Sequence, residues 1–413
     1  MTGPSAQPER AAWPDAVPLP FGAAGPFDQV RPEYGGDSLA DVLPSALAVL
    51  GVPGAPDPLG LAAQLAGVRR IAVLLVDGLG WYQLPTAAPY APVLADLAAR
   101  SGRPLTSGFP STTPTSLVSL GTGAAPGAHG VLGFRVNVPG SDRVLTHINW
   151  SGTADDPRAP DPDPRSWQPL PTQFELAEAA GVAVTVVSRP EHAGSGLTVA
   201  ANSGGVYRGA AEVDTLATEM LAALTAGPGP TLVSGYHPDI DKHGHLTGVD
   251  STAWRDAAAD LDRLLDRLVH GLPADAALLV TADHGQLNVP PDRRFDIDLD
   301  PRLRAGVRVV AGEPRARYLH TLPGAVDDVL AAWTEVLGPA AWVAPRAEAV
   351  AAGWFGPVPE AHLARIGDVV VCCHDSYVVL ASRTDAPIEA KLVAYHGSWT
   401  ATEMTIPLLL ARP

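Results

Sequence analysis

The sequence predicts an α/β fold in which helices flank a mostly parallel central sheet. Apolar runs with the length of buried strands recur along the chain, and each ends in a polar, loop-forming segment. Helical periodicity fills the intervals between these runs, and such alternation is typical of a parallel sheet covered by helices. The 41 glycines and 42 prolines among 413 residues stay below the range of low-complexity chains. A globular protein with many turns is therefore expected.

Four apolar runs predict the core strands of this sheet. They are continuous rather than alternating, which is typical of parallel strands buried on both faces. They lie at 71–76, 182–187, 231–234 and 276–281. Helices are expected at 38–50, 91–100, 115–121 and 252–269, with Ser38 as an N-cap.

The pattern divides the chain into a main domain with two irregular parts. Residues 1–35 are rich in Pro and Gly and predict an N-terminal extension that wraps the surface or frays. Residues 36–413 form the main domain, and the looser pattern at about 292–384 predicts a smaller inserted subdomain. Asp-Pro repeats at 136–167 predict a long surface loop bordering the pocket.

The charge of the chain bears on its partners. A formal net charge of −16 argues against a surface that coats nucleic acid, because such a surface needs clustered Lys and Arg. A small phosphate-bearing molecule is still acceptable, since bound metal ions dominate the local field of such a site. The sequence does not fix the oligomeric state.

The cysteines and the N-terminus bear on the compartment. Cys372 and Cys373 are adjacent, a spacing that rarely forms an unstrained disulfide, so buried thiols in a reducing cytosol are expected. Residues 1–10 do not resemble a signal peptide, and no stretch approaches 18 uncharged apolar residues. The interpretation is a soluble cytoplasmic protein that does not bind membranes.

Aspartate and histidine side chains follow the predicted strands at their carboxyl ends, where ligands gather in sheets of this kind. Imidazole and carboxylate are ligands that zinc prefers, with three protein ligands for each ion. Pro238, Gly244 and Gly248 favour a loop, not a regular helix, around Asp241 and His245. Two transition-metal sites are therefore predicted, from Asp77, Asp241, His245, Asp283, His284 and His396.

Thr113 is the candidate nucleophile. A hydroxyl group is a poor nucleophile unless a metal ion or a base activates it. Thr113-Pro114 is interpreted as a loop that leads into the helix expected from residue 115, whose N-terminal N–H groups suit an anion. Thr112, Thr115 and Ser116 have an ordinary interpretation as capping residues.

Taken together, these motifs resemble those of the nucleotide pyrophosphatase/phosphodiesterases of the alkaline phosphatase superfamily. The resemblance runs from about residue 70 to 400, with the metal motifs in the same order. The nucleophile region is Phe109-Pro-Ser-Thr-Thr-Pro-Thr-Ser116, followed by Thr122-Gly123, Pro126 and His129-Gly130. The metal motifs are Asp77-Gly78, Asp241-Lys-His-Gly-His245, Asp283-His284-Gly285 and His396-Gly397.

The resemblance implies an alkaline-phosphatase-like fold and two divalent ions, zinc first and manganese or magnesium as alternatives. One ion would take Asp241, His245 and His396, and the other Asp77, Asp283 and His284. Thr113 would also bind the second ion and attack phosphorus in line, giving a phosphothreonine that water hydrolyses. Ser116 stands where a side chain would hold a non-bridging phosphate oxygen, and His129-Gly130 is interpreted as structural.

The branch of the superfamily is narrowed by what surrounds Thr113. A sulfatase would carry Cys or Ser in its place. A phosphomonoesterase would usually set an arginine just after the nucleophile, whereas no Lys or Arg lies between Arg103 and Arg135. Phosphodiester or nucleotide pyrophosphate hydrolysis is therefore favoured. A monoesterase acting on a small phosphorylated metabolite, a phosphonate hydrolase, a mutase or transferase and a non-catalytic metal-binding scaffold remain as alternatives.

Overall fold

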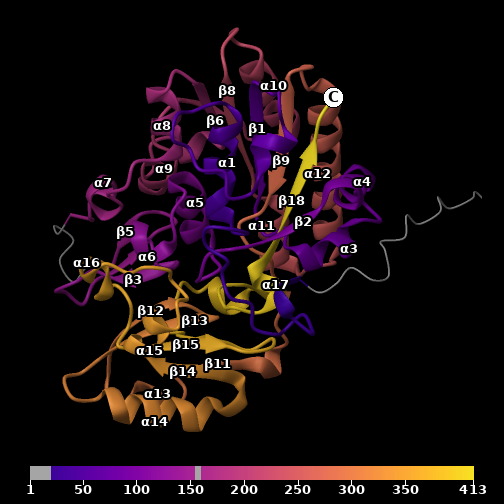
Figure 1. The fold of residues 1–413 in the computed structure, drawn as a ribbon. Helices are drawn as coiled ribbons and strands as arrows, with labels where there is room; N and C mark the ends of the chain where they lie inside the picture. The colour runs from indigo at the N-terminus through magenta and orange to yellow at the C-terminus, as the bar shows by residue number, and fades with distance from the viewer. Residues whose placement is uncertain (1–19, 154–159) are drawn as a thin grey trace, which may run out of the picture.

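A computed structural model of the chain describes residues 20–153 and 160–413. A large sheet with its helices forms the upper part of the molecule in Figure 1, and a smaller sheet lies below it. The large sheet has seven strands in the order β2-β18-β9-β1-β8-β6-β7. Their bounds are β1 Arg70–Val76, β2 Arg103–Thr106, β6 Ala183–Ser188, β7 Val206–Gly209, β8 Thr231–His237, β9 Ala276–Thr281 and β18 Thr405–Ala411.

The large sheet is mostly parallel, as the sequence predicts. Strands β9, β1, β8, β6 and β7 run parallel to one another, and β18 runs antiparallel to both β9 and β2. Within β1, Leu75 pairs with Tyr236 of β8 and with Thr281 of β9. The carboxyl ends of these three strands therefore meet at one edge, and the residues that follow them converge there.

Two groups of helices cover the large sheet (Figure 1). Each was expected from the sequence or lies between expected strands, but some boundaries differ. The helix expected at 115–121 begins two residues earlier, at Thr113, and the one expected at 38–50 opens with a 3-10 turn over Leu39–Asp41. The bounds are α1 Val42–Val49, α4 Pro92–Ser101, α5 Thr113–Thr122, α8 Gln173–Ala179, α9 Gly196–Asn202, α10 Val213–Leu224, α11 Asp239–Thr247 and α12 Thr252–Gly271.

The second sheet has four antiparallel strands and its own hydrophobic core. The strands are β12 Val307–Glu313, β13 Ala316–Thr321, β14 Ala341–Pro345 and β15 Val369–Cys373, in the order β12-β13-β15-β14. Helix α14, Val326–Leu337, packs on this sheet through Val329 and Trp333 (Figure 1). We propose that this unit is the inserted subdomain. Both thiols of β15, those of Cys372 and Cys373, are free and buried.

A buried ion pair joins the second sheet to the edge of the first. The guanidinium of Arg315, in the β12–β13 turn, donates to both carboxylate oxygens of Glu403 at 2.8 and 2.6 Å. Both side chains are fully buried, so removing one partner would leave an uncompensated charge, at a cost of about 3–5 kcal/mol. The carbonyl of Glu403 accepts the N–H of Gly285 at 2.9 Å. The second sheet thereby supports the chain next to the predicted metal site.

The surface loop predicted at 136–167 is wrong for the residues that the structure describes. That segment contributes to a small antiparallel sheet of β3 Arg135–Asn137, β4 Val144–Thr146 and β5 Ser151–Gly152. Trp167 is buried and its indole N–H donates to the buried His147 ring at 3.0 Å. Isolated aromatic residues show no periodicity in the sequence, and for that reason this packing was missed. Residues 154–159 lie outside the described part.

Part of the predicted N-terminal extension is described, and residues 1–19 lie outside the described part. Val30 is fully buried and its N–H donates to the carbonyl of Trp399 at 2.9 Å. The Tyr34 hydroxyl accepts the N–H of Phe109 at 3.2 Å and donates to the carbonyl of Trp354 at 2.9 Å. This segment therefore holds the loop that leads to Thr113.

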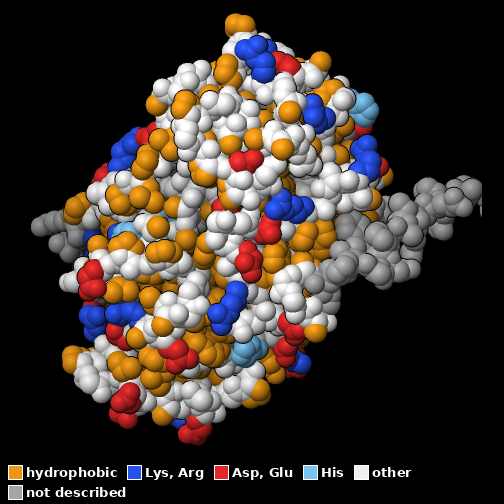
Figure 2. Space-filling view, viewed as in Figure 1, with side chains coloured by type: hydrophobic (Ala, Val, Ile, Leu, Met, Phe, Trp, Pro, Cys, Tyr) orange, Lys and Arg blue, Asp and Glu red, His pale blue; other side chains and the backbone are white. Residues whose placement is uncertain are grey.

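The surface carries both signs of charge. On the face drawn in Figure 2, Lys and Arg side chains stand singly among Asp and Glu rather than in a basic patch. In the described residues, no helix is both long enough and apolar enough to cross a membrane.

Candidate metal centre and nucleophile

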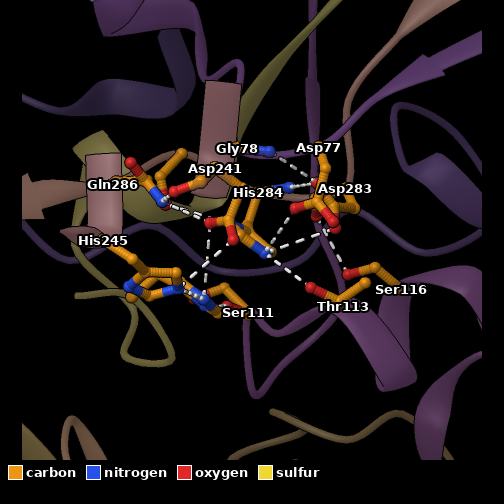
Figure 3. Close-up of polar contacts among 12 residues, drawn as sticks. Asp77, Gly78, Ser111, Thr113, Ser116, Asp241, His245, Asp283, His284 and Gln286 are labelled. Atoms are coloured by element: carbon orange, nitrogen blue, oxygen red, sulfur yellow. Dashed lines mark hydrogen bonds and ion pairs between the residues drawn. The ribbon is translucent and has the colours of Figure 1, made fainter. Parts of the chain in front are cut away.

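Asp77 lies directly after the central strand β1 and is almost fully buried. Its N–H donates to the carbonyl of His237 at 2.9 Å, which continues the β1–β8 pairing by one residue. The hydroxyl of Tyr236, on β8, donates to Asp77 Oδ2. Asp77 Oδ1 has no hydrogen-bond donor and points toward Asp283 and His284 (Figure 3).

Asp283 and His284 follow β9 and are fully buried. Asp283 Oδ1 accepts the N–H groups of Gly78 and His284, both at 3.0 Å, whereas its Oδ2 has no donor. His284 Nε2 lies 3.3 Å from Asp283 Oδ2 and 3.5 Å from Asp77 Oδ1. The structure thus brings together one predicted ligand set, Asp77, Asp283 and His284, around two unpartnered carboxylate oxygens.

Asp241 and His245 lie on helix α11, so the loop predicted for them is wrong. Gly244 lies inside the helix and does not end it. A Cβ at this position would come within 1.6 Å of Gln286 Oε1, so the glycine allows the helix to pack closely against Gln286. Only Gly248, with φ +96°, follows the helix end. His245 Nε2 lies 3.3 Å from Asp241 Oδ2, since four residues make about one turn of helix.

His396 completes the second ligand set. Its Nε2 lies 3.2 Å from His245 Nε2 and 3.8 Å from Asp241 Oδ1, so the structure brings the predicted trio Asp241, His245 and His396 together. The His396 ring also stacks on His284 with centroids 3.6 Å apart. Asp241, His284 and His396 in addition have ligand atoms within 4.8 Å of one another. His284 therefore lies between the two clusters (Figure 3).

The three histidines share one hydrogen-bond arrangement. Nδ1 of each ring faces a backbone carbonyl, which can only accept, so Nδ1 carries the proton and the Nε2 lone pair is left for a ligand. The pairs are His245 with Ala394 at 2.8 Å, His284 with Gly285 at 3.2 Å and His396 with Ser111 at 2.8 Å. Such partners fix the tautomer of histidines that bind metal ions.

The charge at this edge of the sheet fits cations. Burial, followed by the neighbouring Asp283 and Asp241 carboxylates, raises the pKa of Asp77 well above its usual value. Burial, followed by the His284 and His245 rings, lowers the pKa of His396 well below its usual value, so this ring is neutral. Carboxylates that lie close together and a neutral imidazole suit bound divalent cations.

Thr113 is the first residue of α5 and lies beside the ligand set of Asp77, Asp283 and His284. Its hydroxyl is 3.2 Å from His284 Nε2 and its side chain is buried apart from a small exposed fraction (7%). Thr112, in extended conformation, is the N-cap, so the helix N-terminus itself presents Thr113. The N-terminus of a helix favours a negative charge, such as that of a phosphate group.

Ser116 and His129 lie away from the ligand atoms. The Ser116 hydroxyl is fully buried and donates to the carbonyl of Asp283 at 2.9 Å, which leaves no hydrogen for a phosphate oxygen. We propose that Ser116 positions Asp283 and does not bind substrate. His129 is buried beside the Ser119 hydroxyl at 2.9 Å and belongs to neither cluster.

The comparison with known families decides the relationship of this chain. The model of the type I phosphodiesterase/nucleotide pyrophosphatase family matches residues 71–399, which include every predicted ligand and Thr113. The chain belongs to this family. As a member of it, the protein is a phosphoric ester hydrolase. No curated protein matches the chain in sequence.

Solved structures agree with the fold of this family member. Murine ectonucleotide pyrophosphatase/phosphodiesterase 5 is 19% identical, with a TM-score of 0.63 over 83% of this chain and 88% of that one. An inactive variant of the murine protein has been solved in complex with AMP. Phosphonoacetate hydrolase from Sinorhizobium meliloti, with phosphonoformate, is also 19% identical, with a TM-score of 0.60 over 84% of this chain and 90% of that one. The alkaline-phosphatase-like fold is thereby confirmed.

Two residues of this family member that hydrogen-bond to predicted metal ligands were missed from the sequence. Tyr236 donates to Asp77, and the Gln286 amide donates to the Asp241 carboxylate and, at 3.0 Å, to the Asp241 carbonyl (Figure 3). The signal available in the sequence was position. Tyr236 lies near the carboxyl end of β8, the strand next to the one that Asp77 follows, and Gln286 directly follows Gly285. Sequence reasoning stopped at residues that can bind metal themselves.

Replacing Tyr236 by Phe is expected to weaken metal binding at the Asp77 cluster by about 10- to 100-fold, the usual effect of removing a hydrogen bond to a ligand. The ring stays in place while the donor to Asp77 Oδ2 is lost. Metal content after dialysis against graded chelator measures the effect. Tyr90→Phe is the matched control, because Tyr90 is exposed and lies outside both clusters. Equal metal retention in the two variants would contradict the expectation.

Gly78→Ala is expected to lower both the thermal midpoint and metal occupancy. Gly78 has φ +74°, and a Cβ would lie 2.8 Å from the Cα of Asp241, so α11 would have to move. Forcing atoms into a packed site costs about 1–3 kcal/mol beyond the backbone strain. Gly140→Ala separates the two effects, because Gly140 has φ +78° and open space around it. If both variants lose the same stability and metal, the close approach to Asp241 has no role.

Proposed function

We propose that this protein is a two-metal hydrolase that cleaves phosphodiester or nucleotide pyrophosphate bonds through a phosphothreonine intermediate. The supporting observation is the position of Thr113, whose hydroxyl lies 3.2 Å from His284 Nε2 at the N-terminus of α5. A nucleophile beside a cluster of metal-binding side chains is the arrangement that this reaction needs.

The ligand atoms suggest how two ions would be held. Asp77, Asp283 and His284, with Thr113, would bind one ion, and Asp241, His245 and His396 the other. Zinc fits the mixed nitrogen and oxygen donors best, and manganese or magnesium are alternatives. When bound, the two cations would lower the pKa of the Thr113 hydroxyl and stabilise negative charge on the leaving oxygen.

The residues of the chain account for the course of the reaction. The Thr113 oxygen attacks phosphorus as the bond from phosphorus to the leaving oxygen breaks, and the hydroxyl proton ends on the leaving alcohol. Water then hydrolyses the phosphothreonine, giving its hydroxyl to phosphorus and its other proton to Thr113. Helix α5 orients its N-terminus toward the phosphate charge. Tyr236 and Gln286 hold Asp77 and Asp241 in place throughout.

A diester is favoured over a monoester because two candidate arginines, Arg135 and Arg189, are already paired with carboxylates. Arg135, the first basic residue after Thr113, donates to Asp385 and to Glu389, both at 2.7 Å. Arg189, which follows β6, donates to Asp239 at 3.1 Å. A phosphomonoester dianion would need a guanidinium that is not already neutralised, whereas a diester carries one charge fewer.

A substrate panel tests this preference. The value of kcat/KM for bis-p-nitrophenyl phosphate or for the p-nitrophenyl ester of thymidine monophosphate is expected to exceed that for p-nitrophenyl phosphate by about tenfold or more, or about 1.4 kcal/mol of transition-state stabilisation. Release of p-nitrophenol measures all three. A preference for the monoester would support the phosphomonoesterase alternative. Turnover of phosphonoacetate in place of all three esters would support a phosphonate hydrolase. The cytoplasmic location stays a prediction.

A further inference from the structure

Ser111 ties the loop that leads to Thr113 to the segment that carries His396. Its backbone carbonyl accepts the Nδ1–H of His396 at 2.8 Å, and its N–H donates to the carbonyl of Gly397 at 3.3 Å. Its hydroxyl donates to the carbonyl of Ser398 at 2.5 Å. Ser111 is fully buried. Three consecutive residues are therefore fixed to one residue of the loop before the nucleophile.

The second sheet holds the acceptor of the Ser111 hydroxyl in place. The N–H of Ser398 donates to Glu403 Oε1 at 3.0 Å, and its hydroxyl donates to the carbonyl of Cys373, on β15, at 2.7 Å. Glu403 is itself held by the buried ion pair with Arg315. The Ser398 carbonyl is therefore a rigid acceptor, and the Ser111 hydroxyl passes this rigidity to the loop before the nucleophile.

Only Thr112 separates Ser111 from Thr113. Thr112 is extended, with φ −141° and ψ 147°, and its carbonyl accepts the N–H of Ser116 at 3.0 Å, the first hydrogen bond of α5. One residue of extended chain leaves little freedom, because consecutive Cα atoms lie about 3.8 Å apart. The position of Ser111 therefore sets the start of α5 and the direction of the Thr113 side chain.

We propose that Ser111 is a positioning residue whose hydroxyl keeps Thr113 and His396 in one fixed relation. This inference rests on the proposed function. An in-line displacement needs the attacking oxygen and the groups that stabilise the leaving oxygen on opposite sides of phosphorus, and a misplacement of about 1 Å can cost about 10²-fold in rate. Thr113 supplies the attacking oxygen, and His396, with Asp241 and His245, belongs to the other side. A hydrogen bond between the two segments keeps their separation constant.

Ser111→Ala tests the proposal on the metal-loaded protein. It removes the hydroxyl and keeps both backbone bonds, so we expect a folded protein whose kcat for bis-p-nitrophenyl phosphate is about 10- to 100-fold lower. KM is expected to stay within about threefold, since no group that contacts substrate is removed. One ion per chain should also leave at about tenfold lower chelator concentration than in the wild type, because the His396 ring loses support.

Ser119→Ala is the matched control for Ser111→Ala. Ser119 is a buried serine of α5, and its hydroxyl lies 2.9 Å from His129 Nε2, away from both ligand sets. This variant should lose a similar amount of thermal stability and keep the wild-type kcat and chelator resistance within about twofold. If kcat of Ser111→Ala lies within about threefold of kcat of Ser119→Ala, the proposal is overturned.

Ser111→Cys separates the hydrogen bond from the packing, because a thiol fills the space of the hydroxyl but is a weak donor. It is expected to lower kcat about as much as Ser111→Ala does. A wild-type kcat in this variant would show that the hydrogen bond does not position the nucleophile.

The two proposals fail in different ways. If Thr113 is required for hydrolysis of the diester while Ser111→Ala and Ser111→Cys keep the wild-type kcat, only the role of Ser111 is wrong. If Thr113→Ala hydrolyses the diester as fast as the wild type, the proposed function itself is wrong.

Discussion

Thr113→Ala is expected to abolish phosphodiester hydrolysis, with a loss of at least about 10³-fold in kcat. The substitution removes the only atom of the chain that we assign to attack on phosphorus, while Asp77, Asp283 and His284 remain to hold a metal ion. The measurement is p-nitrophenol release from bis-p-nitrophenyl phosphate, together with the metal content of the variant. We expect lost turnover with at least one ion retained per chain.

Thr115→Val is the matched control for Thr113→Ala. Thr115 lies two residues later in α5, is fully buried, and its hydroxyl has no hydrogen-bond partner. Removing that hydroxyl is therefore expected to change kcat by less than about threefold, because an unpaired buried hydroxyl contributes no net stabilisation. A labelled phosphothreonine trapped by acid quench in the wild type, and absent from Thr113→Ala, would identify the attacking atom directly. Equal turnover in the wild type and Thr113→Ala would rule out this mechanism.

Removal of metal ions is expected to abolish activity and to lower the thermal midpoint. Asp77 Oδ1 and Asp283 Oδ2 are buried without a hydrogen-bond donor, so without a cation both oxygens stay unsatisfied, which costs stability. Ions present at about 100 times their Kd stabilise the folded chain by about 2.7 kcal/mol per site. Dialysis against a chelator, followed by activity and melting measurements, tests both effects.

Adding back single metals then identifies the ions and their number. Restored activity with zinc at two ions per chain would support the proposed ligand sets, and preference for manganese or magnesium would change the metal but not the sites. Asp77→Asn and Asp241→Asn are each expected to bind one ion fewer, since each removes a charge from a different cluster. A chelated protein that keeps its activity and its thermal midpoint would contradict the metal centre.

The parts of the fold that the sequence predicted are those with strong local patterns. The continuous apolar run that ends at Val76 is typical of a strand buried on both faces, and the structure places it at the centre of the large sheet. The loop predicted around Asp241 from Pro238, Gly244 and Gly248 was wrong, because Gly244 lies inside helix α11. Gly244 is needed for close packing of α11 against Gln286, which lies far along the chain. No local pattern carries that information.

The sequence by itself determined the class of the fold, the ligand types and the candidate nucleophile, because each depends on residue type and on position after a strand. Only the tertiary structure decided which groups meet. It placed His284 between the two clusters, directed the Ser116 hydroxyl to the Asp283 carbonyl, and bonded Tyr236 to Asp77. It also shaped a cavity between α5, α9 and the ends of β6 and β8 from segments far apart in the chain. Contacts between distant segments follow from strand order and register, which the one-dimensional pattern does not contain.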